Sequence, residues 1–74
     1  MSYFKQGMYE SVVKFATSVL ENDKDNVKAF YRRGVAYKHL KQYRGAKSDL
    51  TRVKALDESM ADEIDKLMAD IARL

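Results

Sequence analysis

Residues 26–37 read "NVKAFYRRGVAY", and this stretch decides the fold of the middle of the chain. Its packing candidates, together with the next apolar residue, recur at spacings of three and four: Val27, Phe30, Tyr31, Gly34, Tyr37 and Leu40. Residues at these spacings share one face of an α-helix. Asn26 or Asp25 can cap the first turn by accepting an orphan backbone N–H. The pattern therefore predicts a helix from about Val27 to Leu40.

Three further segments, 7–22, 43–56 and 60–74, carry an apolar stripe at the same helical spacing. The stripes consist of Met8, Val12, Phe15, Ala16 and Val19, then of Tyr43, Ala46, Leu50, Val53 and Leu56, and finally of Met60, Ile64, Leu67, Met68, Ile71 and Leu74. Polar stretches at 22–26 and 57–59 separate the helices, and Ser59 is the expected cap of the last one. These observations predict an all-α fold of four helices joined as antiparallel helix-turn-helix units.

The composition narrows the class of protein. With 74 residues, the chain holds one domain, and 46% hydrophobic and 34% charged residues are typical of a globular one. Without cysteine, and with a single histidine, we expect no metal site and no cofactor. The net charge of +3 is too small to indicate nucleic-acid binding. There is no apolar run of membrane-spanning length and no signal-peptide pattern, so we expect a cytoplasmic protein that binds neither membranes nor nucleic acids.

The chain also aligns with itself when it is shifted by about 34 residues. The identical pairs in this alignment include Tyr9 with Tyr43, Thr17 with Thr51 and Val19 with Val53. Two others, Val12 with Ala46 and Ala16 with Leu50, keep the apolar stripe. The sequence therefore contains an internal repeat, and residues 27–58 form one complete helix–turn–helix unit.

Within that unit, large and small packing residues alternate: Phe30, Gly34, Tyr37, Ala46, Leu50 and Val53. The order resembles the tetratricopeptide repeat pattern, in which small residues let two helices approach and large ones fill the space between units. Arg33 departs from the pattern, which prefers leucine at its place. The resemblance implies one truncated tetratricopeptide domain over 1–74, with the end of a preceding repeat at 1–22, a complete repeat at 27–58 and a capping helix at 59–74. More narrowly, the stretch resembles the last repeat of FKBP-type immunophilins and of aryl-hydrocarbon-receptor-interacting proteins, which are co-chaperones.

A pair of cations lies in the same stretch. Lys28 and Arg32 are four residues apart, so they lie one turn apart on one helix face. The alternative to a binding role is that this face is an ordinary solvated surface. The resemblance implies that the two cations match part of a clamp for two carboxylates, which would hold the C-terminal peptide of a heat-shock chaperone ending in Glu-Glu-Val-Asp. Arg33 is then expected to face the second helix of the unit or solvent, and Tyr31 is the aromatic residue expected to pack against a ligand.

Other functions were weighed against this interaction module. The apolar face of 7–22 has little of its own chain to cover it, so it can drive self-association into a homo-oligomer that acts as a scaffold. The immunophilin resemblance implies a parent protein with a prolyl-isomerase domain outside these residues. No catalytic residue is expected here, because the carboxylates gather at helix boundaries, where capping explains them. We therefore expect a binding module and not an enzyme.

Overall fold

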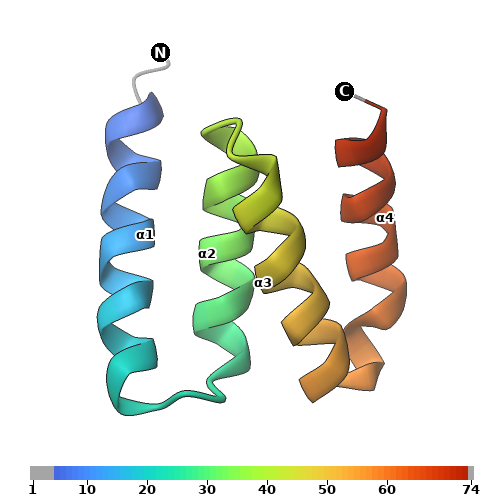
Figure 1. The fold of residues 1–74 in the computed structure, drawn as a ribbon, viewed down its shortest axis with the longest axis horizontal. Coiled ribbons are helices and arrows are strands. Elements are labelled where there is room, and N and C mark those ends of the chain that lie inside the picture. The colour runs from blue at the N-terminus through green and yellow to red at the C-terminus, as the bar shows by residue number, and fades with distance from the viewer. Residues whose placement is uncertain (1–4, 74) are drawn as a thin grey trace.

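The computed structural model describes the backbone of residues 5–73 and the side chains of residues 8–73. Within this range the chain forms four α-helices and one short 3₁₀ turn, and no strand (Figure 1). The elements are α1 (Lys5–Asn22), α2 (Val27–His39), α3 (Tyr43–Leu56), η1 (Glu58–Met60) and α4 (Ala61–Ala72). The predicted all-α fold is confirmed. Residues 1–4 and Leu74, which the sequence placed in the first and last units, lie outside the described residues.

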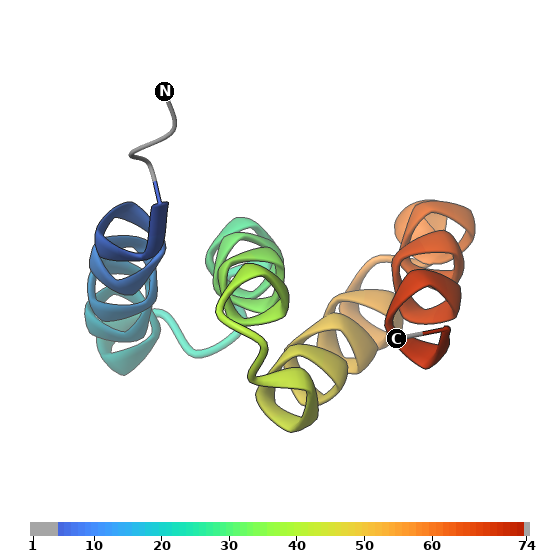
Figure 2. The same ribbon diagram turned by 90° about the horizontal axis from the view of Figure 1, so that it is seen from above.

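Successive helices run antiparallel, and each packs against the next along the chain (Figure 1). Seen from above, α3 is set out of the row of α1, α2 and α4, so that α2 and α4 flank it (Figure 2). This places α2 between two neighbours, α1 and α3, whereas α1 packs against α2. No helix in the described range is both long enough and apolar enough to span a membrane.

The helix spacing repeats along the chain. Helix α1 ends at Asn22 and α3 ends at Leu56, and 56 − 22 is 34. Helix α2 begins at Val27 and α4 begins at Ala61, and 61 − 27 is again 34. The fold is therefore a series of helical hairpins with the period expected from the sequence. The division into a preceding repeat, a complete repeat and a capping helix stays a prediction.

Side chains cap two of the helical segments. The Asn26 Oδ1 accepts a hydrogen bond from the Ala29 N–H at 2.9 Å, which confirms Asn26 as the cap of α2. The prediction for Ser59 was wrong. The Asp57 carboxylate instead accepts from the N–H and the hydroxyl of Ser59 and caps η1, because this 3₁₀ turn comes between Asp57 and α4. Helix α4 begins after Met60 without a side-chain cap.

The end of α2 is a tight left-handed turn. Lys41 has a φ of 65°, in the region that favours glycine. Its N–H donates to the carbonyl of Lys38, and the N–H of Gln42 donates to the carbonyl of Tyr37 at 2.8 Å. This pair of hydrogen bonds is the Schellman motif, which satisfies the last free carbonyls of a helix. The motif turns the chain sharply and lets α3 begin at Tyr43, directly against α2.

The main core lies between α2, α3 and α4. Ala46, Leu50, Val53 and Ile64 are completely buried, and Phe30 and Tyr37 pack against them. Gly34 permits the close contact of α2 with α3, because a Cβ there would lie 2.8 Å from the Leu50 Cδ2. The six repeat-packing positions predicted from the sequence are therefore in the core or directly against it.

The burial of α1 and α2 differs from the apolar stripes in two ways. Ala29 and Ala36 are buried, although they lie off the predicted stripes, because α1 and α3 enclose α2 from two sides. Leu20 of α1 is also buried off its stripe, because it packs with Ala16 and Ala29 where α1 meets α2. Met8 and Phe15 lie on the predicted stripe of α1, yet they are 55% and 68% exposed. The stripe of α1 thus has an open part, and this part lines the candidate site.

Candidate peptide-binding groove

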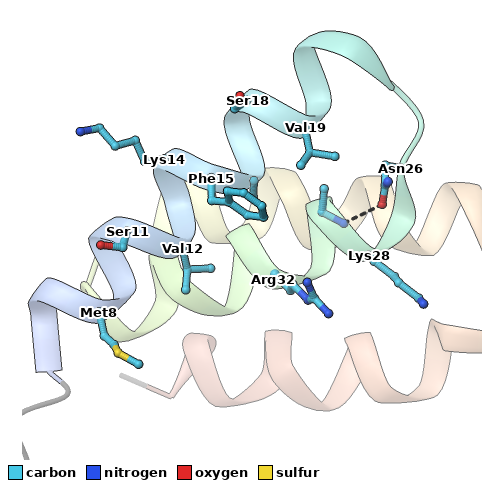
Figure 3. A pocket seen from close by; sticks show the side chains of 12 residues that line it. Met8, Ser11, Val12, Lys14, Phe15, Ser18, Val19, Asn26, Lys28 and Arg32 are labelled. Atoms are coloured by element: carbon cyan, nitrogen blue, oxygen red, sulfur yellow. Dashed lines mark hydrogen bonds between the residues drawn. The ribbon is translucent and has the colours of Figure 1, made fainter.

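A groove of about 910 Å³ runs between α1 and α2. Figure 3 shows its two walls, with side chains of α1 facing the space and two cations of α2 at its edge. The residues that line it are Met8, Ser11, Val12, Lys14, Phe15, Ala16, Ser18 and Val19 from α1, and Asn26, Lys28, Ala29 and Arg32 from α2 and its cap. The groove is therefore apolar along α1 and polar at its rim.

The internal repeat explains why this face of α1 is open. Val12, Ala16 and Val19 correspond to Ala46, Leu50 and Val53, shifted by 34 residues. The three residues of α3 are completely buried, because α3 has helices on two sides, α2 and α4. Within the described residues, α1 is covered by α2 on one side only. Its remaining apolar side chains form the wall of the groove.

The charged residues of the groove all have the same sign. Lys28 and Arg32 are exposed and line it from adjacent turns of α2, and Lys14 lies on α1. Among the residues that the structure describes, none of those lining the groove is acidic. Among the side chains that the structure describes, neither Lys28 nor Arg32 takes part in a salt bridge. An ammonium and a planar guanidinium on adjacent turns can bind carboxylates by charge-assisted hydrogen bonds.

Tyr31 is not among the residues that line this groove, and its expected role in packing against a ligand stays a prediction. Its hydroxyl donates a hydrogen bond of 2.6 Å to the Glu63 carboxylate on α4. That bond, together with partial burial and the charge of Glu63, raises the pKa of Tyr31. The reason is angular, because a residue one position before Arg32 on a helix points about 100° away from it. Tyr31 therefore links α2 to α4.

Arg33 makes the contact that the sequence left open. Its Nε and Nη2 donate to the two oxygens of the Asp49 carboxylate on α3 at 2.7 and 2.9 Å. Its Nη1 donates to the Thr17 hydroxyl on α1 at 3.1 Å. The hydrogen bonds to Asp49 raise the pKa of Arg33, against the opposing effect of burial. Of the two directions expected for Arg33, the second helix of its unit or solvent, the structure shows the first.

This contact matters to the site, because Arg33 ties both walls of the groove to α3. Sequence reasoning missed Asp49, which is 4% exposed and lies among apolar residues. The available signal was an arginine at a place where the repeat pattern prefers leucine, since a charge at a packing position needs a buried partner. Asp49 is that partner.

One other pair of titratable residues, Tyr9 and His39, has a structural role. The His39 ring stacks on the Tyr9 ring with 4.3 Å between centroids, so the end of α2 packs against the start of α1. Within the described residues, no cluster of His, Asp and Glu side chains could hold a metal ion.

Comparison with known proteins adds evidence on the class of domain. No protein-family model matches the chain, and no solved structure matches it. Outer envelope protein 61 of Arabidopsis thaliana is 43% identical over 63 residues, which cover 81% of this chain and 11% of that protein. Sperm-associated antigen 1 of Homo sapiens is 37% identical over 62 residues, which cover 84% of this chain and 7% of that protein.

The chain thus spans only a small part of these two relatives, so the similarity concerns a domain and not a whole protein. Neither similarity supports the narrower resemblance to FKBP-type immunophilins. Together with the helical hairpins and their 34-residue spacing, the two similarities support a tetratricopeptide-like helical domain, of the kind that serves as a protein-interaction module.

Proposed function

We propose that this domain binds the acidic C-terminal tail of a heat-shock chaperone, with Lys28 and Arg32 holding the carboxylates. The observation that carries the proposal is the position of the two cations. They lie on adjacent turns of α2, exposed, at the rim of a groove whose described lining residues include no acidic one. A peptide that ends in aspartate presents two carboxylates close together, which matches two cations one helical turn apart.

The two cations have different tasks in this proposal. The planar guanidinium of Arg32 can bind both oxygens of one carboxylate, and the ammonium of Lys28 acts as a point charge for the second. The apolar wall of α1 lies beside them, so the exposed Met8 and Phe15 can cover aliphatic side chains of the same peptide. The ion pair of Arg33 with Asp49 fixes α2 against α3 and so sets the position of the two cations.

The family resemblance seen in the sequence supports a further proposal about the location and type of the whole protein. A partner of this kind places the domain in the cytoplasm, within a co-chaperone of the immunophilin-like type. Any prolyl-isomerase activity of such a protein would belong to residues outside these 74. The proposed role of the residues described here is binding.

The test is a titration of a labelled Met-Glu-Glu-Val-Asp peptide into the wild-type chain and into Lys28→Ala/Arg32→Ala. Loss of two charge-assisted hydrogen-bond donors should weaken binding by at least about tenfold. Arg44→Ala/Lys47→Ala is the matched control, because it removes two exposed cations from α3, outside the groove. The same peptide with an amidated C-terminus tests the role of the terminal carboxylate. Equal affinity of the two double variants would refute the proposed site.

A further inference from the structure

The shape of the groove fits a helix. The α1 residues Met8, Val12, Phe15 and Val19 line it at spacings of four, three and four, which form one straight stripe along the helix. Ala16 and Ala29 are small and buried where α1 meets α2, so these two helices lie close together beside the groove. In α3, Ala46 and Val53 correspond to Val12 and Val19 in the internal repeat, and they are completely buried because α3 packs against α2 and α4.

The charges of the groove indicate which kind of helix would bind in it. Lys14 lies on one wall, Lys28 and Arg32 lie on the other, and none of the described lining residues is acidic. Figure 3 shows the Lys14 side chain directed away from the groove, so a helix that enters the groove meets the positive charges of Lys28 and Arg32 along α2. Aspartate and glutamate beside its apolar stripe would pair with them, whereas lysine or arginine in the same places would be repelled.

We propose that the groove between α1 and α2 binds an acidic amphipathic helix of a partner protein. The partner helix carries apolar residues at i, i+4, i+7 and i+11, flanked by Asp and Glu, and it packs on α1 as α2 packs on α3. This mode of binding needs no free C-terminal carboxylate, so it goes beyond the function proposed above. It uses the helix-in-groove form of recognition, in which a few apolar anchors supply most of the affinity.

A second copy of the chain is the main rival for the groove. The exposed Phe15 and Met8 favour self-association through α1, which the sequence analysis also predicts. The charges disfavour it, because the copy would bring its own Lys28 and Arg32 to a groove that already holds these two cations. Charge complementarity therefore points to an acidic partner, and self-association becomes an outcome of the test.

The probe is a synthetic helix of about four turns, acetylated and amidated, with leucine at the four stripe positions and glutamate beside them. A second peptide has lysine in place of each glutamate. We expect the acidic peptide to bind, to gain helicity by circular dichroism on binding, and to bind at least about tenfold more tightly than the basic peptide. Binding of the acidic peptide should weaken by a similar factor in Phe15→Ser, because that side chain lines the groove.

Two features make this experiment decisive. Phe15 is 68% exposed, so its replacement leaves the core intact, and Leu56→Ser is the matched control on α3, outside the groove. The chaperone-tail peptide proposed above should lose its affinity when its C-terminus is amidated, whereas the acidic helix is amidated and should still bind. Each proposal can therefore fail without the other.

The result that overturns the inference is equal binding of the acidic and basic peptides, or equal binding to Phe15→Ser and Leu56→Ser. Sedimentation equilibrium of the chain alone tests whether a second copy of the chain occupies the groove. A dimer that becomes monomeric in Phe15→Ser would assign the groove to a second copy and would also overturn the inference. A monomer that binds the acidic helix would support it.

Discussion

The Arg33 guanidinium and the Asp49 carboxylate form a two-pronged ion pair inside the helical hairpin of α2 and α3. Two N–H groups of Arg33 reach the two carboxylate oxygens at 2.7 and 2.9 Å, and the Asp49 side chain is only 6% exposed. A third N–H reaches Thr17, so the same side chain also ties α1 to the hairpin. One charged residue at a packing position thus connects three of the four helices.

Asp49→Ala should lower the free energy of unfolding by about 3 kcal/mol, because it leaves the Arg33 charge without its buried partner. Arg33→Leu/Asp49→Ala should recover most of the loss, since it removes both charges and restores an apolar side chain at a packing position. Urea denaturation followed by circular dichroism measures both effects. Asp65→Ala is the control, because its pair with Lys54 has the same 2.7 Å distance but is exposed, and it should cost less than about 1 kcal/mol. A double variant less stable than Asp49→Ala would contradict this account.

Gly34→Ala should destabilise the domain by about 1–3 kcal/mol, although alanine is the better helix former by about 1 kcal/mol. The new Cβ would lie 2.8 Å from the Leu50 Cδ2 and 3.3 Å from the Asp49 Cβ, and Leu50 is completely buried and cannot move aside. Thermal unfolding of the two proteins measures the difference. Ser48→Ala, at an exposed position of α3, should leave stability unchanged or raise it slightly. A stabilised Gly34→Ala protein would show that α2 and α3 are less closely packed than the structure indicates.

Lys41→Gly should stabilise the domain by about 0.5–1 kcal/mol, because Lys41 holds a left-handed φ of 65° that costs a side-chain-bearing residue about 1–2 kcal/mol. Part of that gain is lost to the greater freedom of glycine in the unfolded chain. The control is Lys47→Gly, in the exposed interior of α3, which should instead lose about 1 kcal/mol. Chemical denaturation of both variants measures the sign of the change in the free energy of unfolding for each. Destabilisation by both would rule out strain at Lys41.

The link between Tyr31 and Glu63 predicts a dependence of stability on alkaline pH. The hydrogen bond to Glu63 raises the pKa of Tyr31 in the folded state above the ordinary value near 10. A raised folded pKa favours the protonated hydroxyl, so its stabilising contribution is fully present below the unfolded pKa and is lost as the pH rises through the folded one. Wild-type protein should therefore lose more stability than Tyr31→Phe between about pH 9 and pH 11. The measurement is the free energy of unfolding of the two proteins as a function of pH. Parallel curves between about pH 9 and pH 11 would exclude the link between Tyr31 and Glu63.

Much of the fold follows from local patterns that are visible in the sequence. The apolar spacing in α3 sets which face of this helix is buried, and Gly34, Ala46 and Leu50 lie where the repeat pattern places small and large residues. Asn26 caps α2, as its side chain and position predict. These features could be predicted because each depends on residues within a few turns of one another.

Other features depend on which helices meet, and these the sequence could not supply. Tyr31 follows the same apolar spacing as its neighbours, yet it faces α4, where Glu63 accepts its hydroxyl hydrogen. Phe15 lies on a well-formed stripe, yet it is exposed, because only one side of α1 has a neighbouring helix within the described residues. Periodicity marks the apolar face of a helix but does not say whether another helix covers it.

The sequence by itself determined the helices, their 34-residue period and the cationic pair at Lys28 and Arg32, because helical spacing and capping are local properties of the chain. Only the tertiary structure decided that this pair borders an open apolar groove and that Asp49 is the partner of Arg33. Both relationships join residues on different helices. Such contacts form only when the helices pack, since burial removes a charge from water and makes a specific partner necessary.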